Sequence, residues 1–117
     1  MKTDLTYLRE MSAGNKELVR EMIEIFITQV NDFYAQMDEL LEQKEWDKLG
    51  KLCHKAKSSV SIMGQDKLAK DLKWVEIDSK TNKTVEKYPE IIQRFKDETT
   101  IIVKELTEVS ENIDNYF

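Results

Sequence analysis

The sequence predicts an all-α protein: an antiparallel up-down-up-down four-helix bundle with a short N-terminal helix. The 117 residues include only 3 glycines and 1 proline, while 35% are charged, a balance typical of soluble helical proteins rather than of sheets with many turns. Apolar residues also recur in alternating steps of three and four along four long segments, which places them on one face of a helix. The length is that of one domain, so we expect residues 1–117 to form a single bundle.

The first helix is expected to be short. Asp4 can cap it, because a side-chain oxygen at this position accepts a bond from a free N–H of the first turn. Leu5, Leu8 and Met11 provide its apolar face. A break over residues 12–15, which include a glycine and an asparagine, ends it.

The second helix is expected from Lys16 to about Gln43, a length of about 40 Å. Its inward-facing residues are Val19, Ile23, Phe26, Val30, Phe33, Met37 and Leu40. Ile27 and Tyr34 lie off this stripe, one seven-residue step apart. They either pack against the N-terminal helix or belong to an exposed docking patch.

The third helix is expected over residues 45–64, where Gly64 ends it. Its apolar stripe consists of Trp46, Leu49, Cys53, Ala56, Val60 and Met63. The connection before it, Gln43 and Lys44, is short, so this helix should return antiparallel to the second.

Two further helices complete the predicted bundle. Asp66 is a suitable cap for one of them, which continues until the polar residues 79–83 break the pattern; its inward residues are Leu68, Leu72 and Val75. Proline is tolerated only in the first turn of a helix, so Pro89 starts the last helix between Thr84 and Tyr88. Its stripe is Ile92, Phe95, Thr99, Ile102, Leu106, Val109 and Ile113.

Composition excludes several classes of function. No apolar run is long enough for a membrane span or a signal peptide, so we expect a cytoplasmic protein, and the starting Met favours a free-standing one. The single cysteine, Cys53, lies on a buried stripe and cannot form an internal disulfide. One histidine and one buried cysteine do not make a zinc site, no di-iron spacing is present, and no glycine-rich loop could bind a nucleotide phosphate. We therefore expect no metal or cofactor on this chain.

The only histidine, His54, lies roughly 150° from the middle of the buried stripe of its helix, so its ring should face water. Small residues lie one or two turns away on the same side, at Gly50, Ser58 and Ser61. Lys51 and Lys57 are each three residues from the histidine, on either side. The result is an exposed imidazole in an open, basic surface, accessible to another macromolecule.

Charge is unevenly distributed along the chain. The net charge is −5, which argues against general nucleic-acid binding. Residues 44–83 nevertheless hold ten lysines against six acidic residues, a net charge of +4, and the rest of the chain is then −9. Lysines on helices are usually only solvated, but a histidine among them favours an anionic partner.

Covalent phosphorylation of the imidazole fits these residues best. A ring nitrogen with a pKa near 6.5 is substantially neutral at pH 7 and can attack phosphorus without a dedicated base. Lys51 and Lys57 would offset the added negative charge. A Ser-His-acid triad is disfavoured, because a convex helix face provides neither a pocket nor an oxyanion hole.

The segment from Leu52 to Gly64, LCHKAKSSVSIMG, together with Leu68-Ala69 and the stretch from Leu72 to Glu76, LKWVE, resembles the histidine-containing phosphotransfer (HPt) domains. In that family a histidine is followed by a lysine three residues later, a small pair, a glycine ten residues after the histidine, and a leucine-rich helix ending in glutamate. The resemblance extends more weakly to residues 14–18 and Phe26.

The resemblance implies that His54 carries a phosphoryl group on its outer ring nitrogen, with Lys57 beside it. The group would move to or from the aspartate of a receiver domain, in a response regulator or a hybrid histidine kinase, and the receiver would bring its own Mg²⁺. The chain would then be a relay intermediate in a two-component phosphorelay, a monomer without kinase activity of its own, and its partners would include neither nucleic acid nor a membrane.

Two alternatives remain open at this point. The chain could be a non-catalytic helical adaptor or scaffold that binds a signalling partner without phosphate turnover, with His54 an ordinary surface residue. It could also be a small enzyme with His54 as general base, which would need a concave pocket at that position. The sequence shows no residues that would build such a pocket.

Overall fold

The structure, a computed structural model, describes residues 2–117, and within that range the chain is helical and contains no β-strand. This confirms the predicted all-α class. In chain order the elements are α1 (Thr6–Ser12), α2 (Lys16–Glu42), α3 (Trp46–Ile62), α4 (Asp66–Asp78), the 3₁₀ turn η1 (Val85–Lys87), α5 (Tyr88–Glu111) and α6 (Ile113–Tyr116).

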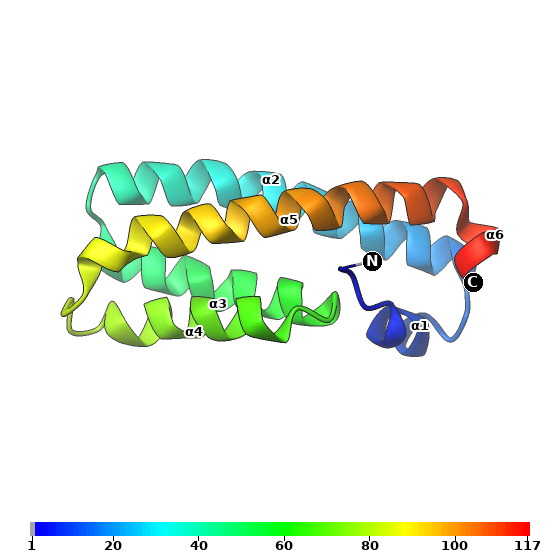
Figure 1. The fold of residues 1–117 in the computed structure, drawn as a ribbon, viewed down its shortest axis with the longest axis horizontal. Helices are drawn as coiled ribbons and strands as arrows, with labels where there is room; N and C mark the ends of the chain where they lie inside the picture. Colours follow the sequence, from blue (N-terminus) through cyan, green and yellow to red (C-terminus); the bar gives the residue numbers. More distant parts are fainter. Residues whose placement is uncertain (1) are drawn as a thin grey trace.

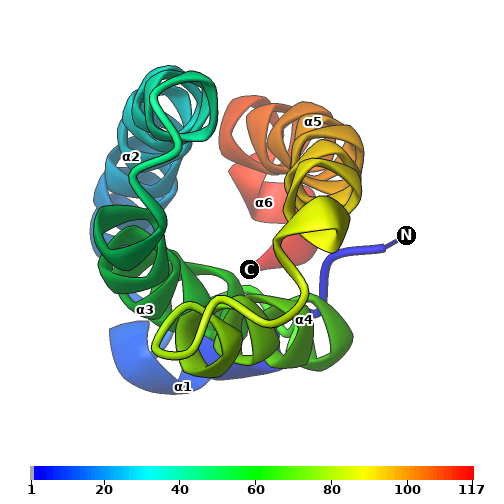
Figure 2. The same cartoon turned by 90° about the vertical axis from the view of Figure 1, so that its left-hand side faces the viewer.

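Four long helices form the body of the molecule, which measures 47 × 21 × 20 Å. Viewed end-on, α2, α3, α4 and α5 occupy four corners around a common centre (Figure 2). Consecutive members pack against each other, and α5 also packs against α2, so the four helices enclose one core. Figure 1 shows that α3 and α4 are shorter than α2 and α5, and that they cover one part of the length of those two helices.

The core consists of the stripes that the sequence predicts. All of the residues in the four predicted stripes are buried except Leu40 and Trp46, which are half-buried. The periodicity of three and four residues therefore identified the inward face of each long helix correctly, because one stripe per helix must leave water when helices pack.

The short helix α1 covers the part of α2 and α5 that extends beyond the α3–α4 turn (Figure 1). Leu5 and Leu8 are buried there, as predicted. The expectation for Met11 is wrong: its side chain is 50% exposed, because a helix of two turns offers only a narrow face to the core. Asp4 accepts a hydrogen bond from the backbone N–H of Thr6 at 2.9 Å, although Leu5 is the residue that precedes the helix.

The turns follow the predicted breaks, with one exception. Gly64 has a φ of +73°, a left-handed conformation that favours glycine, and the chain reverses there between α3 and α4. Pro89 lies in the first turn of α5, as expected. Asp66 does not cap α4; it is the first helical residue, preceded by Gln65, and no side chain makes a capping bond there.

Tyr34 contacts α5, so neither of the two roles considered for it holds. Its ring packs edge-on against Phe95 at 6.0 Å between centroids, and its hydroxyl hydrogen-bonds with the hydroxyl of the buried Thr99. Ile27 is half-buried against the core. Both residues therefore stabilise the bundle.

The loop between α4 and α5 is organised by a group that we call the Asp78 cluster: Asp78, Thr84 and Tyr88. Tyr88 is fully buried and its hydroxyl donates to Asp78 Oδ2 at 2.7 Å, while the backbone N–H of Thr84 donates to the same oxygen at 3.0 Å. The bond from Tyr88 is the main cause that lowers the pKa of Asp78. Burial, and then the bond to Asp78, raise the pKa of Tyr88.

Candidate functional site

His54 lies in the middle of α3 with its side chain 61% exposed, so the predicted exposure of the imidazole is confirmed. The ring leaves α3 on the side next to α4. Its neighbours toward the core are buried, with Cys53 fully enclosed, and this anchors the backbone that carries the ring. An exposed ring on a rigid helix is thus held at a defined place on the surface.

The partner of His54 is Glu76, which the sequence analysis did not identify. His54 Nδ1 lies 2.8 Å from Glu76 Oε2, across the interface of α3 and α4. Gly50 makes this approach possible: a Cβ there would lie 1.9 Å from Ser79 Oγ, so only glycine lets α4 come this close. The next turn of α3 then places His54 beside Glu76.

Lys57 binds the other oxygen of the same carboxylate. Its Nζ lies 3.0 Å from Glu76 Oε1 and 3.4 Å from His54 Nδ1. The bond from Lys57 is the largest cause that lowers the pKa of Glu76, and the bond from His54 adds to it against the opposing effect of burial. Glu76 is therefore ionised at neutral pH and bridges the lysine and the histidine. We call His54, Lys57 and Glu76 the His54 cluster.

This geometry determines the tautomer of the imidazole. An ionised carboxylate only accepts hydrogen bonds, so the nitrogen that it contacts must carry a proton. Since Glu76 is closer to Nδ1 than Lys57 is, Nδ1–H donates to Glu76 and the neutral ring keeps its lone pair on Nε2. Within residues 2–117, Nε2 has no hydrogen-bond partner. The ring nitrogen that Glu76 does not contact therefore carries the free lone pair.

The other residues predicted around His54 are only partly brought together. Ser58 and Ser61 are exposed on the same helix, as expected. Lys51 is exposed but pairs with Asp47 at 3.2 Å, one turn toward the N-terminus and not at the imidazole. Gly50 lines the hollow beside His54 between α3 and α4, but the expectation that it is exposed is wrong, because it is buried against α4.

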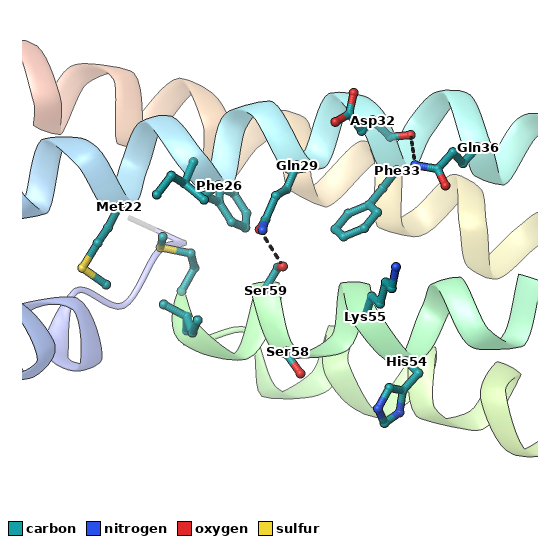
Figure 3. A pocket seen from close by; sticks show the side chains of 13 residues that line it. Met22, Phe26, Gln29, Asp32, Phe33, Gln36, His54, Lys55, Ser58 and Ser59 are labelled. Atoms are coloured by element: carbon teal, nitrogen blue, oxygen red, sulfur yellow. Dashed lines mark hydrogen bonds between the residues drawn. The ribbon is translucent and has the colours of Figure 1, made fainter.

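A groove runs between α2 and α3 beside His54, with a volume of about 720 Å³. The expectation of a purely convex surface is therefore wrong. Figure 3 shows that Phe26 and Phe33 line the groove, that Ser59 donates across it to Gln29, and that His54 and Ser58 point away from α2. Side chains of both α2 and α3 line the groove, so the projection of a single helix does not reveal it.

Cys53 is buried and takes no part in this surface. Burial raises the pKa of its thiol to about 12, and the nearby negative charge of Glu76 contributes in the same direction. The thiolate that a nucleophile or a metal ligand requires is thus absent at neutral pH. This agrees with the sequence-based view of Cys53 as a core residue.

Among residues 2–117, no group of three or more His, Cys, Asp or Glu side chains is arranged to hold a metal ion. In the same range, no helix has a stretch both long and apolar enough to cross a membrane. Comparisons of the chain with protein-family models, curated proteins and solved structures found no match.

Proposed function

We propose that this protein is a histidine phosphotransfer protein, in which His54 relays a phosphoryl group to or from the aspartate of a receiver domain. The proposal includes the arrangement of α2 to α5 as an up-down-up-down four-helix bundle of the HPt type. It is supported above all by one observation: His54 is exposed with Nδ1 held by Glu76, which leaves the lone pair on Nε2 free.

The transfer step follows from this tautomer. Nε2 attacks the phosphorus of an acyl phosphate on the receiver, the bond between phosphorus and the aspartate oxygen breaks, and the carboxylate leaves with the electron pair. The phosphorylated imidazole then carries a positive charge with its proton still on Nδ1. Glu76 stabilises that cation through the existing 2.8 Å contact, and the reverse step regenerates the same neutral tautomer.

Lys57 supports the site through Glu76. It holds the carboxylate by a 3.0 Å bond and remains partly buried at the α3–α4 interface. Its charge also lies next to the imidazole, where it favours the arrival of a dianionic phosphoryl group. Lys57 is thus a positioning residue for Glu76 and a source of local positive potential.

The proposed transfer also depends on groups that the receiver supplies. The Mg²⁺ that neutralises the transferring phosphoryl group belongs to the receiver, and the chain acts as a cytoplasmic, monomeric relay intermediate without kinase activity. The competing proposal is a non-catalytic adaptor that uses the same surface without phosphate turnover. The two differ in whether His54 becomes phosphorylated.

The test uses phosphoramidate and a phosphorylated receiver in parallel. Phosphoramidate donates its phosphoryl group to Nε2 with loss of ammonia and needs no docking. Labelled phosphate should appear on this protein from both donors in an acid-labile, base-stable form. His54→Gln should abolish both labels with an unchanged melting temperature, because the ring contributes little to packing. A wild-type protein that no receiver labels would favour the adaptor.

Ser58→Tyr refines the test of how a receiver reaches His54. A bulky residue one turn from His54 should block labelling by the receiver and leave labelling by phosphoramidate intact, since the new ring extends into solvent. Thr107→Tyr, also at an exposed helical position but on α5, is the matched control and should label normally with both donors. Normal exchange between the Ser58 variant and its receiver would contradict this approach to the ring.

A further inference from the structure

The outer face of α4 is unusual in charge and exposure. Three of the four acidic side chains of α4 are turned inward and paired: Asp71 with Arg94 at 3.0 Å, Glu76 with His54 and Lys57, and Asp78 with Tyr88. Asp66 lies in the first turn. The three paired side chains, Asp71, Glu76 and Asp78, therefore contribute little negative charge to the outer surface of the helix.

Lysines occupy the side that these acidic residues leave. The α4 face, as we call it, consists of Lys67, Lys70, Lys73, Trp74 and Ile77 on the helix and Lys80 in the turn that follows it. Its four lysines are exposed, and in the described part of the chain none of them has a carboxylate within 4 Å. The face thus has a local positive charge that its own chain does not neutralise.

Two large apolar side chains lie among these lysines. Ile77 is 55% exposed and Trp74 is 38% exposed. They are three residues apart, so they lie on the same side of the helix, one turn from each other. The opposite side of α4 is fixed in the core by Leu68, Leu72 and Val75. The helix therefore cannot turn to bury the exposed pair.

The α4 face is continuous with the site. Lys80 and His54 line the same hollow between α3 and α4, which has a volume of about 380 Å³. Glu76, on the flank of α4, forms one of its walls. His54 therefore stands between two surfaces: the apolar groove of α2 and α3 on one side, and the α4 face on the other.

We propose, building on the phosphotransfer function above, that the α4 face is a docking surface for the phosphate-exchanging protein. The complementary partner surface presents carboxylates around an apolar side chain, so that the carboxylates meet Lys70, Lys73 and Lys80 while the apolar group covers Ile77. A partner that brings its aspartate to Nε2 reaches this face, because the two share the hollow beside His54. Opposite charges across the contact increase the rate of association and orient the partner.

A protein is favoured over an anionic membrane as the occupant. The chain outside residues 44–83 has a net charge of −9, so a broad negative surface that attracts the α4 face repels much of the rest of the molecule. A protein can instead place a few carboxylates locally. The apolar contribution is also small, since one isoleucine and one tryptophan insert little area into a bilayer.

The experiment measures transfer from a phosphorylated receiver as a function of receiver concentration, at low ionic strength. Lys73→Glu should raise KM about tenfold with little change in kcat, and added salt should reduce the difference. Ile77→Ser should raise KM about fivefold, as loss of a modest apolar contact predicts. Neither change touches His54, Lys57 or Glu76.

The chain offers a matched control for each variant. Lys104→Glu reverses the same charge at another exposed lysine, and Ile101→Ser removes a similarly exposed isoleucine (48% against 55% for Ile77), both on α5. These controls should keep KM within about twofold of wild type. Labelling by phosphoramidate should be normal in all four variants, which shows that fold and nucleophile are intact.

Three results would overturn the inference while leaving the phosphotransfer function in place. One is a KM for Lys73→Glu no higher than that for Lys104→Glu. Another is Lys73-dependent binding to phosphatidylserine vesicles with unchanged receiver kinetics, which would assign the face to a membrane. A third is self-association of the wild type that Lys73→Glu abolishes, while the receiver kinetics of the two proteins are the same. Absence of any transfer to wild-type protein would instead reject the proposed function on which this inference rests.

Discussion

Two carboxylates on α4, only two residues apart, have very different surroundings in this protein. Glu76 faces α3 and belongs to the His54 cluster, whereas Asp78 is the centre of the Asp78 cluster next to α5. Hydrogen bonds lower the pKa of both. The side chain of His54, which Glu76 binds, is 61% exposed and keeps one ring nitrogen free. The tyrosine bound by Asp78 is fully buried.

The two clusters differ in how completely the bound side chain is satisfied and enclosed. In the Asp78 cluster the tyrosine hydroxyl is hydrogen-bonded to the carboxylate, and the buried tyrosine ring packs edge-on against the rings of Trp46 and Trp74, at 5.5 and 6.2 Å between centroids. These contacts stabilise the fold. In the His54 cluster one ring nitrogen is held and the other is left open. The same type of contact, a carboxylate with a ring-bearing side chain, therefore encloses the side chain in one place and leaves a ring nitrogen free in the other.

The largest effect is expected from Tyr88→Ala. Removing a fully buried aromatic ring and leaving a cavity should lower the free energy of unfolding by about 4 kcal/mol, as chemical denaturation would measure. The rate of labelling by phosphoramidate, per folded molecule, should stay at the wild-type value. A folded variant that labels slowly would show that the two clusters are coupled.

The second-largest effect is expected from Glu76→Gln. The amide can still accept a bond from Nδ1–H but provides no charge for the imidazolium that forms, so labelling by phosphoramidate should slow about tenfold, or about 1.4 kcal/mol in the barrier. Asp71→Asn makes the same chemical change on α4 away from His54 and should leave the rate unaltered. Equal rates in the two variants would remove Glu76 from the mechanism.

A smaller effect is expected from Tyr88→Phe, which keeps the ring and removes only the hydroxyl. The loss of one hydrogen bond to Asp78 should cost about 1 kcal/mol of unfolding free energy. Tyr7→Phe, at a residue that is 45% exposed, is the control and should be neutral. If both variants are neutral in thermal or chemical unfolding, the bond between Tyr88 and Asp78 contributes no net stability.

The smallest effect concerns pH. Because folding lowers the pKa of Glu76, its contribution to stability is complete above the ordinary carboxyl pKa, about 4.3, and disappears as the pH falls through the lower value of the folded state. The stability of wild type relative to Glu76→Gln should therefore decrease as the pH falls below about 5. A difference that grows below that pH would reverse the inferred direction of the shift.

The sequence predicted the helices and their inward faces well, because each long helix buries a single stripe and hydrophobic periodicity reports that stripe directly. It also predicted an exposed His54 from its angle to Cys53 and Ala56. These are properties of one helix at a time. They follow from local spacing and need no knowledge of the neighbouring helix.

The errors concern contacts between helices. Gly50 was expected at the open surface and Glu76 was given no role beyond its place in a motif, although the buried approach of Gly50 to Ser79 sets the register that brings Glu76 to His54. Tyr34 was placed against the N-terminal helix or at the surface, yet it contacts Phe95 of α5. Helical projection gives an angle around one axis and cannot state which neighbour lies at that angle.

The buried thiol of Cys53 is a chemical probe of transient unfolding of the core. The side chain is fully buried, its pKa is raised to about 12, and it is the only cysteine. An alkylating reagent can react with it only during moments when the core around α3 comes apart, so the rate of modification counts those events. Because the alkylated atom is the Cys53 sulfur and not an imidazole nitrogen, the same preparation can also be tested for labelling of His54 by phosphoramidate.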